Sequence, residues 1–398
     1  MKALTTNRRD MLAGATMAVL AGGPALSATR RANAPAVKGG KKADALCKAV
    51  FAESKAPAFT VAVARTSGPV WSAAYGRANV ELAVDATTAH SFRLGSVSKV
   101  LTSTLAARLV SRGLLDLDTR IAKWLPDLPA HHRQTTLRQL LTHRGGVRHY
   151  TPRDFDITGP GGAVYGRLYR TNQDVLDLFI NDPLIAPPGS RVSYSSYGFT
   201  LASLVMEKAA DRPFVSMIKE EIGQPFGLGS LIEDEPTALI AARATGYMNE
   251  MDLTVLYGQL PAEVRPKLTN GVGNMPWSNP AYCWAGAGFL LTTPDAARFG
   301  AALLDSPNAR ISAAERSLLF TPMTQADKNS PPLGLAWRVD ADVKNRQRWH
   351  HAGATPGGRY GLIVYPEQGL SVAMASNVMS APGNVLKYAS DLVDVFAA

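Results

Sequence analysis

The pattern of apolar positions changes twice along the chain, from strand-like to helical and back to strand-like. Short runs rich in β-branched and aromatic residues predict strands near both ends, at residues 59–64, 70–75, 335–339, 361–365 and 370–375. Turn residues at 67–69 join the first two runs and turn residues at 366–369 join the last two, so each pair predicts a β-hairpin. Strands at both chain ends indicate one sheet to which both ends contribute.

Helical periodicity fills the rest of the chain. Apolar residues after Ser96 lie on one helical stripe that ends at Gly113, which predicts a helix beginning at Ser96. Further helical segments are expected at 136–143, 199–210, 293–303 and 384–396. The prediction is an α/β (α+β) fold, in which an antiparallel sheet from both chain ends is flanked by helices. It carries an inserted helical region at about 119–284, rich in Pro and Gly loops.

Residues 1–28 have the three parts of a secretory signal peptide. Arg8 and Arg9 precede an apolar stretch, residues 11–28, that ends in small residues. This stretch is shorter than the about 20 strongly apolar residues of a spanning helix and contains Pro24, so no membrane span is expected. The arginine pair resembles a twin-arginine export signal. We therefore expect a periplasmic or secreted protein, with a mitochondrial presequence as the alternative.

The formal net charge of +10 is concentrated near the start of the chain. Residues 1–28 carry +2 and residues 29–42 carry +5, which leaves +3 for residues 43–398. Residues 29–44 are thus expected to form a basic, solvated tail. No aromatic-interleaved basic stripe follows, which argues against nucleic acid as a partner. Cys47 and Cys283 can form at most one disulfide, and buried free thiols are the simpler expectation.

Ser96 and Lys99 form a Ser-x-x-Lys motif at the start of the expected helix. An i, i+3 spacing places the hydroxyl and the ammonium on the same helical face. Serine becomes a good nucleophile when a base takes its proton, and a lysine can be that base when burial or neighbouring charge lowers its pKa from about 10.4. A second match, Ser216 with Lys219, lies in an amphipathic helix and is interpreted as structural.

Tyr194 is a candidate for proton transfer. It follows a Pro-Pro-Gly segment at 187–189 and precedes a helix, so its phenol can be presented to a cleft from a loop. A tyrosine beside a lysine can pass protons to and from a leaving group. Tyr247 is the competing candidate, but it lacks the Pro-Gly approach and the following helix. A packing role is the other alternative for Tyr194.

The third candidate element is a strand that runs into a Gly-rich turn at residues 349–358. Its small residues, Gly353 among them, let a substrate backbone lie against the strand edge. The backbone N–H of Ala354 can serve with that of Ser96 as an oxyanion donor. His351 is a candidate to anchor a substrate carboxylate or to help proton transfer, and the alternative is that the paired histidines are ordinary surface or core residues. An imidazole with a pKa near 6.5 would make this anchor weaken as the pH rises through neutrality.

These motifs, in this order, resemble those of the serine β-lactamase and penicillin-binding-protein superfamily, class C branch. The similarity extends to linking segments such as 92–95, 140–143 and 284–289, and it covers about residues 45–396. Segments 145–150 and 194–199 most resemble the mitochondrial serine β-lactamase-like proteins and their bacterial relatives. The resemblance implies a β-lactamase/transpeptidase-like fold and a serine hydrolase domain at residues 45–398.

The resemblance also implies a role for each catalytic candidate. Ser96 would be the acylated nucleophile, and Lys99 and Tyr194 would be the proton-transfer pair. The N–H groups of Ser96 and Ala354 would form the oxyanion hole.

Two positions depart from the family pattern. Ser196 stands where an Asn usually contacts the substrate, and its shorter side chain cannot reach as far. His351, two residues before Gly353, stands where true β-lactamases usually have a Lys. The expected substrate-binding residues are Ser196, His351, Gly353 and Ala354.

The expected function is that of a serine hydrolase that forms an acyl-enzyme and acts on a peptide of D-amino-acid type or on an ester. A class C-like β-lactamase is one alternative, and a non-catalytic scaffold or penicillin-recognising protein on the same fold is another. The chain lacks the Gly-x-Ser-x-Gly segment of an α/β-hydrolase, and its seven histidines include no His-x-His or His-x-x-x-His pair. Neither a metal nor another cofactor is expected. The sequence leaves the oligomeric state open.

Overall fold

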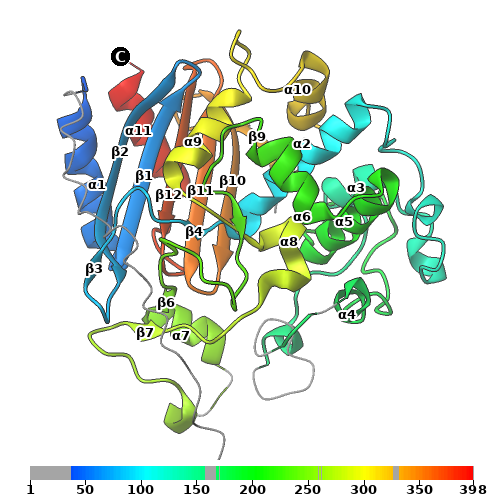
Figure 1. Ribbon diagram of the computed structural model, residues 1–398, viewed down its shortest axis with the longest axis horizontal. Helices are drawn as coiled ribbons and strands as arrows, with labels where there is room; N and C mark the ends of the chain where they lie inside the picture. The colour runs from blue at the N-terminus through cyan, green and yellow to red at the C-terminus, as the bar shows by residue number, and fades with distance from the viewer. Residues whose placement is uncertain are drawn as a thin grey trace, which may run out of the picture. The chain divides into compact units, whose positions relative to one another are not determined.

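The computed structural model of the protein has a seven-stranded antiparallel sheet at its centre (Figure 1). It describes residues 37–156, 167–169, 171–258, 260, 262–325 and 331–397, and Lys38–Ala398 form one compact unit. The strand order is β3-β2-β1-β12-β11-β10-β9. The strands are β1 (Ala58–Arg65), β2 (Gly68–Asn79), β3 (Val84–Asp85), β9 (Arg338–Ala341), β10 (Gln347–Thr355), β11 (Gly358–Tyr365) and β12 (Leu370–Ser376).

The two chain ends meet in the middle of this sheet. β1 pairs with β12 in antiparallel register, with Val61 opposite Met374. Both strands are buried along almost their whole length, because helices cover both faces of the sheet. The predicted hairpins are present as β1–β2 and β11–β12. The expected antiparallel sheet from both chain ends is therefore confirmed.

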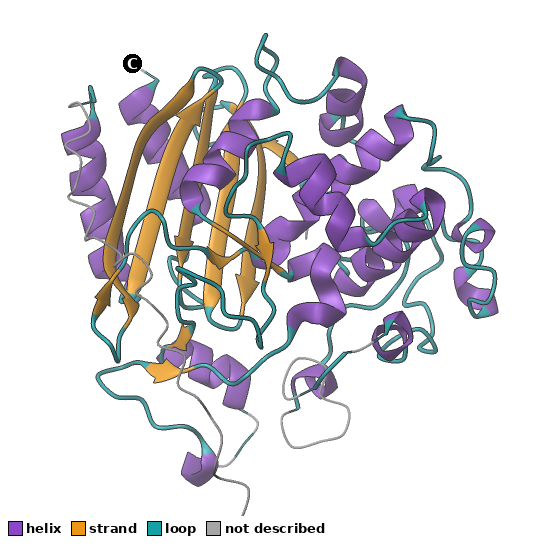
Figure 2. Cartoon of the chain, viewed as in Figure 1, coloured by secondary structure: helices purple, strands orange, loops and turns teal. Residues whose placement is uncertain are grey.

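Alternating side chains of the central strands supply two separate cores. Val61 and Val372 pack on one face with residues of α1 (Gly40–Ser54) and α11 (Val385–Phe396). Ala62 and Ala373 face the other side, where α9 (Thr293–Ala302) lies across the sheet (Figure 2). A Cβ on Gly300 of α9 would lie 2.2 Å from Ser371 Oγ, so the glycine is what lets this helix approach the strands closely.

Helices and loops make up most of the inserted region, as predicted. The helices between β4 (Phe92–Arg93) and β8 (Phe289–Leu291) are α2 (Ser98–Ser111), α3 (Leu137–Leu141), α4 (Asn172–Leu176), α5 (Ser196–Ala210), α6 (Phe214–Met217), α7 (Glu250–Tyr257) and α8 (Trp284–Ala287). α10 (Ala313–Phe320) follows α9. The region also contains three short strands that were not expected, β5 (Ile232–Glu233), β6 (Tyr247–Met248) and β7 (Gly273–Asn274). The buried helix α5 is its central element.

Two elements differ from their predicted positions. Helix α1 begins at Gly40 and buries Ala43, so the end of the segment 29–44, expected as a solvated tail, belongs to the folded unit. The strand expected at 335–339 lies instead at Arg338–Ala341. The reason is a turn in which the Gly334 N–H donates to the Trp337 carbonyl, while the Ala336 N–H donates to the carbonyl of Leu141 in α3.

Residues 1–36, which include the expected signal peptide, lie outside the described residues. Within the part of the chain that is described, no helix has both the length and the apolarity needed to cross a membrane. Cys47 and Cys283 are both free and buried, as expected.

Candidate active site

Ser96 lies in a 3-10 turn, Gly95–Val97, that leads into α2. The α-helix was expected to begin at Ser96, but it begins two residues later at Ser98. The backbone of Gly95 has a φ of +49°, and a Cβ at this position would lie 3.1 Å from the nitrogen of Ala354. Glycine therefore allows the tight turn that holds the serine between α2 and strand β10.

Lys99 is fully buried in the first turn of α2. Its Nζ donates hydrogen bonds to Ser96 Oγ at 3.2 Å, to Ser196 Oγ at 3.0 Å and to the carbonyl of Gly286 at 2.9 Å. Three partners match the three donors of an ammonium group. They fix the amine next to the hydroxyl of Ser96.

Tyr194 lies on the loop before α5. Its hydroxyl donates to Ser96 Oγ at 2.7 Å, and Lys99 Nζ lies 4.9 Å from the centre of its ring. Ser195 caps α5 by accepting the N–H of Gly198 at 2.9 Å, which ties the loop to the helix start. The structure thus brings together the three residues that the sequence singled out for nucleophilic catalysis.

Strand β10 passes directly beside the serine. A Cβ on Gly353 would lie 2.0 Å from the carbonyl oxygen of Leu94 and 2.9 Å from the nitrogen of Ser96, so a larger residue cannot occupy this position. The next residue, Ala354, is exposed. The backbone N–H groups of Ser96 and Ala354 therefore belong to two segments in direct contact, as an oxyanion hole requires.

Ser196 is the first residue of α5 and is 2% exposed. Its hydroxyl accepts a hydrogen bond from Lys99 at 3.0 Å. The structure thus gives Ser196 a contact with the lysine, and the expected contact with a substrate stays a prediction.

His351 is buried beside the site, with 1% of its surface exposed. Its Nδ1–H donates to the carbonyl of Ala352 at 2.9 Å. Burial, aided by the charges of Arg338 and Lys99, holds the pKa of the imidazole well below its usual value. This lowered pKa argues against titration of His351 near neutrality, and the role of His351 as a carboxylate anchor stays a prediction.

Arg338 is a residue of the site that sequence reasoning missed. It lies on the edge strand β9 opposite His350, and its guanidinium carbon lies 5.9 Å from the centre of the Tyr194 ring. No carboxylate among the residues of the described ranges forms an ion pair with it. No local pattern marks this arginine, since only the pairing of β9 with β10 brings it to the site.

Gly286 is the second missed residue. It lies in α8, and its carbonyl accepts one of the three hydrogen bonds from Lys99. A Cβ on Gly286 would lie 3.4 Å from Ser196 Cβ and 3.6 Å from Lys99 Nζ, which are ordinary contact distances, so the contribution of this residue is its carbonyl. The segment 284–289 had been noted in the sequence only as a linking segment.

The competing motifs lie in other contacts. Ser216 belongs to α6, and Lys219 pairs with Glu233 at 2.8 Å. The hydroxyl of Tyr247 accepts the N–H of Val80 at 2.7 Å and donates to Glu81. Within the described ranges, no group of three His, Cys, Asp or Glu side chains is arranged to hold a metal ion.

Comparison with known proteins identifies the family of the chain. The beta-lactamase family model matches residues 43–394. Among curated proteins, the serine beta-lactamase-like protein LACTB of human mitochondria is 24% identical over 79% of this chain and 70% of its own length. A putative D-alanyl-D-alanine carboxypeptidase of Escherichia coli is 26% identical over 78% of this chain and 75% of its own length.

Solved structures share the fold. The D-amino acid amidase from Ochrobactrum anthropi superposes with a TM-score of 0.73 at 22% identity, covering 89% of this chain and 97% of the amidase. A penicillin-binding protein from Bacillus halodurans gives a TM-score of 0.69 at 23% identity, covering 87% of this chain and 98% of that protein.

Proposed function

The chain belongs to the β-lactamase family, and from this premise we propose that it is a serine hydrolase that forms an acyl-enzyme at Ser96. The observation that carries the proposal is the convergence of two proton-transfer groups on one oxygen. Tyr194 Oη lies 2.7 Å and Lys99 Nζ 3.2 Å from Ser96 Oγ. A scaffold protein has no need of this arrangement, which argues against the non-catalytic alternative.

The proposed reaction starts from the Lys99–Tyr194 pair after it has lost one proton to solvent, as a Tyr194 phenolate beside the Lys99 ammonium. Ser96 Oγ then attacks the carbonyl carbon of the substrate while its proton passes to the Tyr194 oxygen. The tetrahedral oxyanion then accepts the N–H groups of Ser96 and Ala354. Its collapse breaks the bond to the leaving group, which takes the proton back from the pair. Water hydrolyses the acyl-enzyme and releases free Ser96.

We propose a substrate with a free carboxylate, of the D-amino-acid peptide type. Arg338 supports this choice, because its guanidinium lies beside Tyr194 and has no acidic partner within the described ranges. An arginine keeps its charge at every accessible pH and binds a carboxylate through two parallel hydrogen bonds. The name of the carboxypeptidase relative points to the same class.

A β-lactamase remains the second candidate, because the family match and the same cation suit a β-lactam carboxylate equally well. The two functions differ in how fast water removes the acyl group. The test is turnover by the purified protein of D-amino-acid peptides and amides, a neutral p-nitrophenyl ester and nitrocefin, with Ser96→Ala as the blank. Ser96-dependent turnover of peptides with a free carboxylate supports the first proposal, and turnover of amides but not of such peptides supports a hydrolase but contradicts the carboxylate requirement. Turnover confined to nitrocefin supports the β-lactamase candidate instead. No turnover of any of these substrates contradicts both candidates.

We also propose that the protein is exported and acts in the periplasm or outside the cell. Arg8 and Arg9 before an apolar stretch support this proposal. Replacing both arginines with lysine should leave the protein in the cytoplasmic fraction of a bacterial host with a twin-arginine system. An unchanged distribution between fractions would contradict it.

A further inference from the structure

The catalytic tyrosine lies on a loop, so its position depends on what holds that loop. The residues before Tyr194 belong to no helix or strand, and α5 begins two residues after it. Its oxygen must nevertheless stay within hydrogen-bond distance of Ser96 Oγ. The segment 143–154, which overlaps the segments 140–143 and 145–150 noted in the sequence for their resemblance to the family, lies against this loop and supplies two imidazoles.

His149 holds the loop on one side of the tyrosine. Its Nδ1 accepts the backbone N–H of Ser196 at 3.3 Å. Its ring stands at 83° to the ring of Tyr194, with 5.1 Å between the two centres. An imidazole nitrogen that accepts a backbone N–H carries no proton of its own. His149 therefore acts here as an acceptor.

His143 holds the preceding peptide unit, the one that joins Tyr194 to Ser195. Its Nδ1 accepts the N–H of Ser195 at 3.2 Å, and its carbonyl accepts the N–H of Ser193 at 2.6 Å. Its ring centre lies 4.3 Å from that of Tyr194. The two imidazoles thus bind the two N–H groups that follow Tyr194 and also contact its ring, while the His143 carbonyl binds the N–H group of the residue before it.

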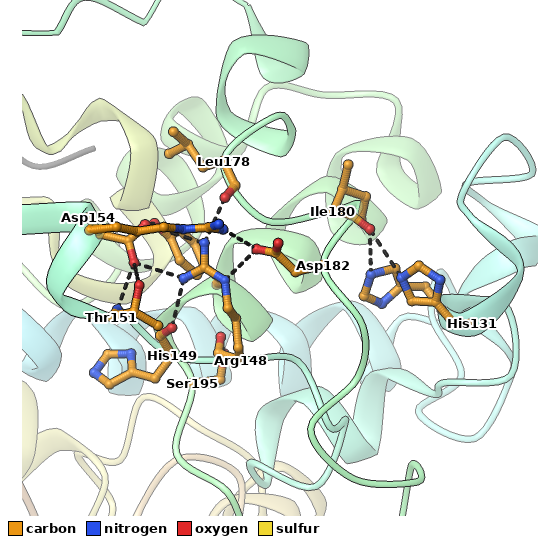
Figure 3. Close-up of polar contacts among 12 residues, drawn as sticks. His131, Arg148, His149, Thr151, Asp154, Leu178, Ile180, Asp182 and Ser195 are labelled. Atoms are coloured by element: carbon orange, nitrogen blue, oxygen red, sulfur yellow. Dashed lines mark hydrogen bonds and ion pairs between the residues drawn. The ribbon is translucent and has the colours of Figure 1, made fainter. Parts of the chain in front are cut away.

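The segment that carries the imidazoles is itself fixed by a buried ion pair (Figure 3). Arg148 binds Asp154 at 2.8 Å and donates to the carbonyl of His149 at 2.9 Å. The carbonyl of Arg148 accepts the hydroxyl of Ser195 at 2.7 Å, and Asp154 accepts the hydroxyl of Tyr197 at 2.9 Å. The ion pair therefore ties this segment to the start of α5, and the imidazoles have a rigid support.

We infer that His149 and His143 are positioning residues that present the hydroxyl of Tyr194 to Ser96 by accepting the N–H groups of Ser196 and Ser195. This inference rests on the proposed function, since it assigns a role to the tyrosine of that site. Neither histidine contacts Ser96 in the hydrogen bonds of the described residues, so both act through Tyr194.

His149 gives the cleaner test, because His143 has a φ of +57°, where a branched side chain would add backbone strain. The amide oxygen of asparagine can take the place of Nδ1 as an acceptor, whereas leucine fills the space without one. The variants are His149→Leu, His149→Asn and each of them combined with Tyr194→Phe. His131→Leu is the matched control, because His131 bonds to the carbonyl of Ile180 and touches none of the catalytic residues.

The readouts are kcat, KM and the rate at which a fluorophosphonate labels Ser96. His149→Leu should lower kcat and the labelling rate by about 10- to 100-fold with KM changed by less than about 3-fold, and His149→Asn should recover most of the loss. In the Tyr194→Phe background, His149→Leu should lower kcat and the labelling rate by less than about a further 2-fold, because the hydroxyl that His149 positions is already absent. His131→Leu should stay near the wild type.

The inference is overturned if His149→Leu lowers kcat by the same factor in the wild-type and in the Tyr194→Phe background. It is also overturned if the asparagine variant folds but has a kcat as low as that of the leucine variant. If His149→Leu does not fold, as judged by its melting temperature, the asparagine variant decides: near-wild-type labelling supports the positioning role, and a folded but slow enzyme contradicts it. Failure of the proposed function would give a different result, because Ser96 of the wild-type protein would then not be labelled at all.

Discussion

The hydroxyl of Tyr194 lies 2.7 Å from Oγ of Ser96, although 98 positions separate the two residues in the chain. Ser96 precedes α2 and Tyr194 precedes α5, and these helices pack against each other and against α8. The distance between the two oxygens is therefore set by the packing of the helical region. This is why the catalytic residues share no short stretch of sequence.

Lys99 and Tyr194 act on the same oxygen, so their substitutions are not expected to be additive. Lys99→Met and Tyr194→Phe should each lower kcat by about 10³-fold or more, and the double variant should be little worse than either single one. The measurement is kcat for the best substrate of the panel. A double variant whose loss equals the product of the single losses would indicate that the two groups act independently.

Arg338 is expected to discriminate substrates by charge. Arg338→Ala should lower kcat/KM for a carboxylate-bearing peptide by about 10- to 100-fold, because the charged partner of the carboxylate is lost. Turnover of a neutral p-nitrophenyl ester should change by less than about 3-fold. Arg338→Lys should fall between the wild type and the alanine variant. An equal loss for both substrates would assign Arg338 a structural role instead.

The pH profile tests which side chain carries the positive charge of the site. Because burial holds the pKa of His351 well below its usual value, we expect its ring to stay neutral between pH 5.5 and 9. The ratio of kcat/KM for a carboxylate-bearing substrate to kcat/KM for the neutral ester should thus stay constant over that range. A ratio that falls with a midpoint near 6.5 would restore His351 as the anchor.

Acid should destabilise the protein over a window that its buried histidines set. Burial, helped by Lys99, lowers the pKa of His149 to about 4, whereas an imidazole in an unfolded chain has a pKa of about 6.5. Between these values the unfolded state binds more protons, so the free energy of unfolding falls as the pH is lowered. The contribution of His149 is on the order of 3 kcal/mol.

The matching measurement is the melting temperature of the wild type and of His149→Asn at pH 7 and pH 4. Asparagine does not titrate in this range, so the melting temperature of the variant should fall less on acidification than that of the wild type. An equal fall in melting temperature in the two proteins would contradict a depressed pKa at His149.

The sequence was sufficient where a signal is local. Ser96 and Lys99 are three residues apart, and the Pro-Gly approach to Tyr194 marks a loop before a helix. The hairpins were predictable for the same reason, because strand and turn residues are adjacent in the chain.

The missed features depend on contacts between distant segments. Arg338 reaches the site only through the register of β9 with β10. Gly286 contributes a backbone carbonyl, which no side-chain motif reveals. His351 was correctly placed on a strand, but its titration follows from burial and from two cations on other elements, and neither can be deduced from its neighbours in sequence. The strand expected at 335–339 begins only at Arg338, because the turn at 334–337 forms a hydrogen bond with α3.

The central claim is that Ser96 is the acylated nucleophile, and the intact mass of the protein after reaction with a fluorophosphonate or a penicillin tests it most directly. The wild type and Ser216→Ala, which keeps the catalytic site and removes the competing serine, should gain the mass of one adduct. Peptide mapping should locate the adduct on Ser96, and Ser96→Ala should gain none and lose about 10⁴-fold or more in kcat. An adduct on the Ser96→Ala protein, or none on the wild type, would contradict the account.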